Sequence, residues 1–154
     1  MQYDMIQYNT INTIQYNTIL YNTITLLGRP NRLFVCFFIT LGYIPSSLSS
    51  NIKVVEWLPQ NDLLAHKDIK AFVSHVGHNS LYESVYHGVP LVGFPLYGDQ
   101  FFNAKKVEHF GLGLYVDHNS FEVDEMVEKI EQVISEPRYC LTQNMMSNTS
   151  VEDI

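Results

Sequence analysis

The sequence predicts an α/β fold in which short parallel strands alternate with helices. Short apolar runs at Ala71–Ser74, Leu91–Phe94 and Leu114–Val116 are typical of buried strands. A helical segment with its own start and stop signals follows each of these runs. Because the connections are short, the pattern indicates right-handed βαβ units, and therefore a parallel sheet flanked by helices.

The remaining elements are assigned from the same signals. Leu33–Leu41 and Lys53–Trp57 are candidate strands upstream of the regular pattern. Glycine or proline follows each of the three longer helices and is expected to end it. The expected helices are a short one through Leu63–Ala65 capped by Asn61 or Asp62, then Ser80–His87, then Asp99 or Gln100 to about Phe110, and Val123 to about Ser135.

Three regions differ in their regularity. Residues 1–27 contain a degenerate repeat, in which Gln7–Ile11 recurs as Gln15–Ile19 and in altered form as Leu20–Ile24. A period of five matches neither a strand nor a helix, so we expect no folded role for the repeat. Residues 1–41 are therefore an unassigned, low-complexity segment, residues 42–139 form the regular domain, and residues 140–154 form a divergent tail.

Composition narrows the class of protein. The 154 residues are 46% hydrophobic and 16% charged, which predicts one folded domain. The net charge of −7 argues against a nucleic-acid binder, which needs a basic surface, but not against binding of a small phosphate ligand. No apolar run reaches the length of a membrane span, and the first residues lack the pattern of a signal peptide. We interpret Cys36 and Cys140 as free thiols.

The segment from Ser74 to Glu83 is the first candidate site. A buried strand ends, a turn containing Gly77 follows, and a helix begins, so that unpaired backbone N–H groups and the positive end of the helix dipole coincide. With donors from His75, Asn79 and Ser80, this arrangement could hold a diphosphate. The alternative is a capping box between Ser80 and Glu83. His75 and His78 have the spacing of metal ligands, but no third ligand is evident.

Two further positions have polar or aromatic side chains at strand ends. Asp99 and Gln100 follow the Leu91–Phe94 strand, where a carboxylate and an amide suit sugar hydroxyls. The alternative for Asp99 is an N-cap. Trp57, the only tryptophan, could stack on a planar base, although a single tryptophan is more often part of a core.

Together these motifs resemble the signature of the UDP-glycosyltransferase family, which includes animal glucuronosyltransferases and plant glucosyltransferases. The resemblance covers residues 42–139, about two thirds of the chain. In order, the matching motifs are Trp57-Leu58-Pro59-Gln60, Leu63-Leu64-x-His66, Ser74-His75-x-Gly77-x-Asn79-Ser80-x-x-Glu83, His87-Gly88-Val89-Pro90, Pro95 and Asp99-Gln100-x-x-Asn103.

The resemblance implies a fold and a set of roles. It implies the Rossmann-like C-terminal domain of a GT-B fold, in incomplete form, with a UDP-sugar as donor substrate and no cofactor or metal. Ser74 and Gly77 belong to the matching turn. The implied contacts are Trp57 and Gln60 with uridine, His75, Asn79 and Ser80 with the diphosphate, Glu83 with the ribose, and Asp99 and Gln100 with the sugar.

The sequence also departs from the family pattern. Animal members usually have two glycines after the histidine, whereas Val76 occupies the first of these positions here. The family's catalytic histidine belongs to an N-terminal acceptor-binding domain, and residues 1–41 do not resemble that domain. We therefore assign no catalytic residue to this chain.

The resemblance implies inverting transfer of a glucuronosyl or hexosyl group to a small lipophilic acceptor with a hydroxyl, this chain supplying only the donor-binding part. The alternative is a non-catalytic truncated form, or a half-enzyme, that associates with another transferase chain. Animal members of the family are endoplasmic reticulum membrane proteins, but no signal peptide or membrane span is evident here.

Overall fold

The structure is a computed structural model that describes residues 23–29, 32–38, 52–55 and 59–139. In this part of the chain strands and helices alternate along most of the sequence. Their bounds are β1 Thr23–Arg29, β2 Arg32–Phe38, β3 Ile52–Val55, α2 Gln60–Leu64, β4 Ile69–Ser74, α3 His78–His87, β5 Leu91–Gly93, α4 Gln100–His109, β6 Gly113–Tyr115 and α5 Val123–Ser135. None of these helices is long and apolar enough to cross a membrane.

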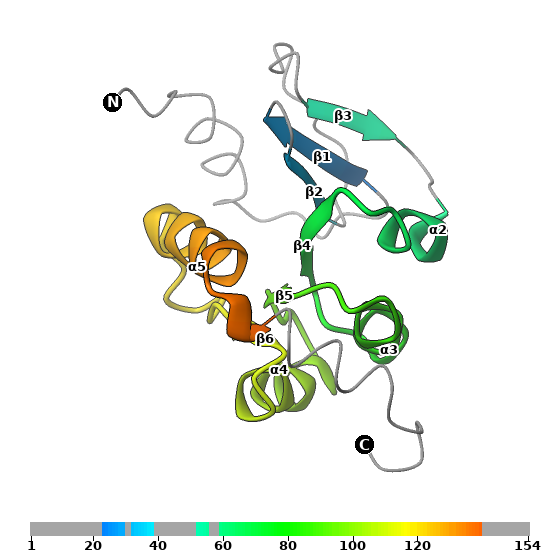
Figure 1. The fold of residues 1–154 in the computed structure, drawn as a ribbon. Coiled ribbons are helices and arrows are strands. Elements are labelled where there is room, and N and C mark those ends of the chain that lie inside the picture. The colour runs from blue at the N-terminus through cyan, green and yellow to red at the C-terminus, as the bar shows by residue number, and fades with distance from the viewer. Residues whose placement is uncertain (1–22, 30–31, 39–51, 56–58, 140–154) are drawn as a thin grey trace.

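The described strands form one sheet in the order β3-β1-β2-β4-β5-β6 (Figure 1). Strands β2, β4, β5 and β6 pair in parallel, which confirms the α/β prediction for this part of the chain. Strand β1 is antiparallel to both of its neighbours. The sheet is therefore mixed, whereas the sequence predicted parallel strands only.

Strand β1 also corrects the interpretation of the repeat. Its residues Thr23 and Ile24 belong to the last copy of the repeat, for which we expected no folded role. The register pairs Arg29 with Arg32, so only two residues connect β1 to β2. A connection of this length allows only antiparallel pairing, which explains the reversed direction of β1. The earlier copies of the repeat lie outside the described residues.

Two hydrophobic cores lie on opposite faces of the sheet, because neighbouring residues of a strand point to opposite faces. Phe72 of β4 packs in the core beneath α2, α3 and α4. Its neighbours Ala71 and Val73 pack in the other core, against Met126 and Val133 of α5. Figure 1 shows α5 on one side of the sheet and α2 and α3 on the other. Burial on both faces explains why these strands are continuous apolar runs.

Most element boundaries agree with the sequence. Helix α5 spans the predicted residues, and α3 ends at Gly88, whose φ of 67° is the left-handed conformation that favours glycine. The predicted cap of α2 is wrong. That helix begins after Pro59 and has no side-chain cap, and the side-chain oxygen Oδ1 of Asn61 instead lies 2.7 Å from His87 Nε2.

Candidate functional site

The candidate site lies where β4 and β5 end side by side. Ser74 and Gly93 are register partners at the last position of each strand. From there β4 continues through residues 75–77 into α3, and β5 continues through residues 94–99 into α4. In parallel sheets ligands bind outside such carboxyl ends, in the loops that enter the helices.

Helix α3 has no side-chain cap at its N-terminus. It begins at His78 with Gly77 as N-cap residue, so Ser80 lies inside the first turn. The alternative of a capping box between Ser80 and Glu83 is therefore wrong. Because no side chain caps this end, its backbone N–H groups are available to an anion, and the helix dipole favours negative charge there. Asn79 is exposed on the same turn.

Ser80 and Glu83 instead form a cluster with Gln60 at the start of α2. The Gln60 Nε2 amide donates to Glu83 Oε2 and lies 3.4 Å from Ser80 Oγ. The three residues are half-buried or buried and come from two helices. The fold thus brings together three predicted site residues that are separated by about twenty positions, and leaves a carboxylate and an amide beside the uncapped helix end.

His75 covers the N-terminus of α3. A Cβ atom built on Gly77 would lie 2.5 Å from His75 Nε2, so the ring rests directly against the N-cap residue. Burial lowers the pKa of His75 below its ordinary value of 6.5, and the negative charge of Asp99 partly opposes this effect. Its Nδ1 atom is buried and has no hydrogen-bond partner among the described residues. At neutral pH His75 is thus an uncharged ring that can donate one hydrogen bond.

Val76, between His75 and Gly77, has a strained backbone. Its φ of 55° is rare for a β-branched residue. Its N–H donates to Ser74 Oγ over 3.1 Å, and its carbonyl oxygen accepts from Asn103 Nδ2 over 3.0 Å. The side chain is fully buried and packs over Gly93, where a Cβ would lie 3.2 Å from Val76 Cγ1. Ser74 therefore supports the turn from within, and the valine side chain is accommodated over Gly93.

The second connection is organised by side chains of α4. Gln100 Oε1 accepts from the N–H groups of Leu96 and Tyr97 over 2.8 and 3.2 Å, and Gln100 itself is buried. Asp99 is exposed at the N-cap position without a capping bond, and its Oδ2 accepts from Asn103 Nδ2 over 3.0 Å. Gln100 thus holds the loop with its oxygen, whereas Asp99 faces solvent at the site.

The fold brings some of the predicted site residues together, whereas others lie apart or outside the described residues. Gln60, Ser80 and Glu83 form one cluster, and His75 and Gly77 meet at the uncapped end of α3. Trp57, expected to stack on the base, lies outside the described residues. The sequence motif contained Asn103, but we assigned it no role, because a single asparagine inside a helix gives no signal of the two bonds that it makes.

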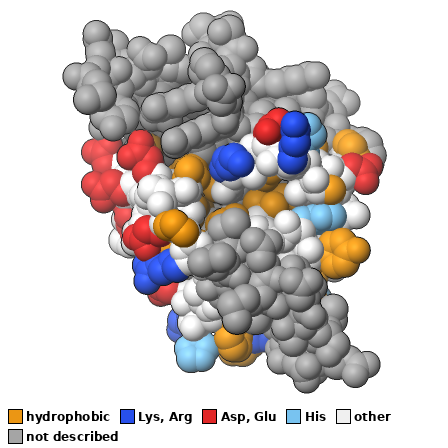
Figure 2. Space-filling model, viewed as in Figure 1, with side chains coloured by type: hydrophobic (Ala, Val, Ile, Leu, Met, Phe, Trp, Pro, Cys, Tyr) orange, Lys and Arg blue, Asp and Glu red, His pale blue; other side chains and the backbone are white. Residues whose placement is uncertain are grey.

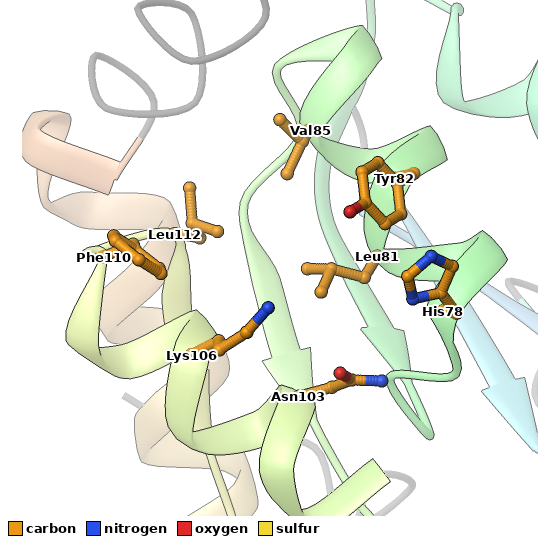
Figure 3. A pocket seen from close by; sticks show the side chains of 8 residues that line it. All are labelled: His78, Leu81, Tyr82, Val85, Asn103, Lys106, Phe110 and Leu112. Carbon is orange, nitrogen blue, oxygen red and sulfur yellow. The ribbon is translucent and has the colours of Figure 1, made fainter. Parts of the chain in front are cut away.

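A small pocket lies between α3 and α4, beside this site. Figure 3 shows its lining, which is mainly apolar and includes Leu81, Val85 and Leu112, with Lys106 and the amide of Asn103 at one side. None of the ten residues predicted to bind the donor lines this pocket. Among the described residues no group of three histidine, cysteine, aspartate or glutamate side chains could hold a metal ion.

A group of acidic side chains lies on α5, away from the uncapped helix end. Asp124 and Glu125 lie in the first turn of α5, and Glu128 and Glu131 follow on the same helix. Figure 2 shows acidic side chains gathered on the side of the molecule where α5 lies. Helix α5 packs on the face of the sheet opposite to α3, so most of this charge does not oppose an anion at the N-terminus of α3.

The sequence and the fold both match known glycosyltransferases. The model of the family UDP-glucoronosyl and UDP-glucosyl transferase matches residues 35–153, a wider range than the regular segment 42–139, and the chain belongs to this family. The 2-hydroxyacylsphingosine 1-beta-galactosyltransferase of Rattus norvegicus is 45% identical over 98 residues, which are 64% of this chain and 18% of that protein. The UDP-glucuronosyltransferase 2B17 of Homo sapiens is 42% identical over 98 residues, which again are 64% of this chain and 18% of that protein.

Solved structures support the fold. Os79 from O. sativa, in complex with UDP and deoxynivalenol-3-glucoside, superimposes with a TM-score of 0.57 and 33% identity, over 60% of this chain and 23% of that one. The described α/β unit is therefore an incomplete Rossmann-like domain of the kind found in GT-B glycosyltransferases. The chain spans less than a fifth of the length of the two curated relatives described above.

Proposed function

We propose that this chain supplies the UDP-sugar-binding part of an inverting UDP-glycosyltransferase. One observation supports this most directly, namely the uncapped N-terminus of α3 with the His75 ring resting on Gly77. Backbone N–H groups at this end suit the diphosphate of a nucleotide sugar, and an uncharged His75 can donate one further bond. When the diphosphate binds, its charge favours protonation of His75 and strengthens the contact.

The other polar groups suit the two ends of the same ligand. Glu83 accepts from Gln60 and has a second carboxylate oxygen for ribose hydroxyls, while Gln60 and Trp57 are proposed to hold the uridine. The exposed Asp99 carboxylate, whose charge acts on His75, is proposed to accept from sugar hydroxyls, with Gln100 supporting the loop beside it. Asn79 is proposed to add a donor to the diphosphate.

The chemistry that follows is displacement of UDP from the anomeric carbon by an acceptor hydroxyl. The donor site contributes by holding the leaving diphosphate and orienting the sugar, which lowers the entropic cost of reaching the transition state. We assign no general base to the described residues. The proposed donors are UDP-glucuronate or a UDP-hexose, and the proposed acceptor is a small lipophilic alcohol, in line with the names of the glucuronosyl and galactosyl transferases that the chain resembles.

A calorimetric titration of UDP into the purified chain tests the proposal. We expect a Kd of ~10 μM to ~1 mM, which corresponds to about −7 to −4 kcal/mol. His75→Ala and Glu83→Ala should each weaken binding by more than about tenfold, because each removes a polar contact to the ligand. His109→Ala, an exposed histidine at the end of α4, is the matched control and should bind normally. Full affinity in both site variants would refute the proposal.

A further inference from the structure

Asn103 joins the two connections that form the site. Its side chain is buried, with 5% exposed, and its Nδ2 atom lies 3.0 Å from both the Val76 carbonyl oxygen and Asp99 Oδ2. Figure 3 shows its amide nitrogen pointing from α4 toward the segment that leads into α3. An amide NH2 group carries two hydrogens, so one bond can be made to each acceptor.

The two acceptors belong to different parts of the proposed ligand site. Val76 lies in the turn proposed to hold the diphosphate, whereas Asp99 is proposed to hold the sugar. Both need support, because the Val76 backbone is strained and the Asp99 carboxylate is otherwise free to move in solvent. A buried donor that serves both acceptors fixes their positions relative to each other.

The bond to Val76 also has a consequence for the next peptide group. The peptide bond between Val76 and Gly77 is planar, so the Val76 carbonyl and the Gly77 N–H point in opposite directions. Holding the carbonyl toward Asn103 therefore directs the Gly77 N–H away from α4. That N–H group belongs to the N-cap residue of α3, where the His75 ring lies.

We propose that Asn103 is a positioning residue that sets the diphosphate-binding turn and the sugar-binding carboxylate in one fixed arrangement. The proposal rests on the proposed function and extends it to a residue that does not itself contact the donor. It predicts that removing the amide weakens recognition of the nucleotide and, separately, removes the selectivity for the attached sugar. A residue with only a packing role would change stability without changing that selectivity.

Two variants and one control separate these possibilities. Asn103→Ala removes both donors without adding charge, and Asn103→Asp keeps the shape but replaces the NH2 group by an acceptor. The control is Val107→Ala, on the next turn of the same helix, because Val107 is fully buried and Val107→Ala destabilises α4 without touching either acceptor. All four chains are titrated with UDP and with UDP-glucose, and their unfolding is measured in urea.

Both Asn103 variants are expected to bind UDP about tenfold more weakly than the unmodified chain. The ratio between the affinities for UDP-glucose and UDP should fall toward one in these variants, since Asp99 is no longer held in place. Val107→Ala should keep the original ratio even where it unfolds more easily. If Asn103→Ala keeps the original UDP affinity and the original ratio, the proposal is wrong.

The titration of His75, followed by NMR, gives a readout without a ligand. The charge of Asp99 raises the pKa of His75, so releasing Asp99 should lower that pKa further. We expect Asn103→Ala to lower the His75 pKa, as Asp99→Asn does. In the double variant the His75 pKa should be no lower than in Asp99→Asn alone. An unchanged His75 pKa in Asn103→Ala, together with a lowered one in Asp99→Asn, would overturn the proposal. If the unmodified chain binds neither UDP nor UDP-glucose, the proposed function fails, and this titration alone decides whether Asn103 positions Asp99.

Discussion

The two connections that form the site differ in length, burial and strain. Residues 75–77, between β4 and α3, form a short, half-buried turn that contains the buried, left-handed Val76. Residues 94–99, between β5 and α4, form a longer loop in which Leu96, Tyr97, Gly98 and Asp99 are exposed. The short turn is held by buried bonds at Ser74 and Asn103, whereas the loop is held by one oxygen of Gln100 and, at Asp99, by Asn103.

This difference matches what each end of the proposed ligand requires. A diphosphate is bound best by N–H groups that are fixed before it arrives, because no reorganisation is then needed. A sugar presents several hydroxyls that act as both donors and acceptors, so the exposed residues of a longer loop beside the Asp99 carboxylate can adjust to them. In this interpretation the strain at Val76 is the cost of a rigid turn.

The largest expected effect comes from adding one methyl group to the turn. In Gly77→Ala the new Cβ would lie 2.5 Å from His75 Nε2, so the ring must leave the end of α3. We expect the affinity for a UDP-sugar to fall about 10- to 100-fold, which corresponds to about 1.4–2.8 kcal/mol. Isothermal titration calorimetry with UDP-glucose measures the change.

The matched variant in the loop is Gly98→Ala. Gly98 has a φ of 63°, and an added Cβ would meet nothing within 4 Å. We therefore expect only the cost of a left-handed alanine, about 1 kcal/mol in the free energy of unfolding, and an affinity within about threefold of the original. Equal losses of affinity in both alanine variants would show that the loop is as rigid as the turn.

A smaller difference is expected between two substitutions at Val76, and their order should be unusual. Val76→Ala removes buried methyl groups but keeps the left-handed strain, at an expected cost of about 2 kcal/mol. Val76→Gly loses more buried surface, but it also removes a strain of roughly 1–2 kcal/mol. Glycine should therefore be no more destabilising than alanine, although a buried position normally shows the reverse order. Urea unfolding of the three chains measures this, and a clearly less stable glycine variant would argue against strain at Val76.

The sequence predicted the regular part of the fold well, because local signals determine it. The apolar runs of β4, β5 and β6 lie between clear turn and helix signals, and Gly88 marks the end of α3 by its conformation. Strand β1 was missed because the repeat obscured it. The alternation Thr23-Ile24-Thr25-Leu26 has the period of a strand, and it continues beyond the last repeat.

The site was predictable as a set of residues but not as a set of contacts. Ser80 and Glu83 have the spacing of a capping box, and only the approach of α2 brings Gln60 to them instead. In the same way, Asp99 has the sequence of an N-cap, but its carboxylate bonds to Asn103. Both outcomes depend on how helices pack, which no short segment of sequence contains.

The smallest expected effect is a dependence of the free energy of unfolding on pH. It measures how Asp99 of the loop acts on His75 of the turn. Burial lowers the pKa of His75 below 6.5, which is its ordinary value in the unfolded chain. Below about pH 6.5 the unfolded chain therefore binds a proton that the folded chain does not, and the free energy of unfolding falls as the pH falls. The loss ends once the pH is below the folded pKa, where both states are protonated.

Two substitutions should move this dependence in opposite directions. His75→Gln removes the titrating group, so the part of the acid destabilisation that it causes should disappear. Asp99→Asn removes the charge that raises the pKa of His75, so the folded pKa falls further and the loss of stability continues to lower pH. Urea unfolding between pH 8 and pH 5 measures the three curves. If Asp99→Asn follows the original curve, the carboxylate of the loop does not act on the turn, and the two connections work independently.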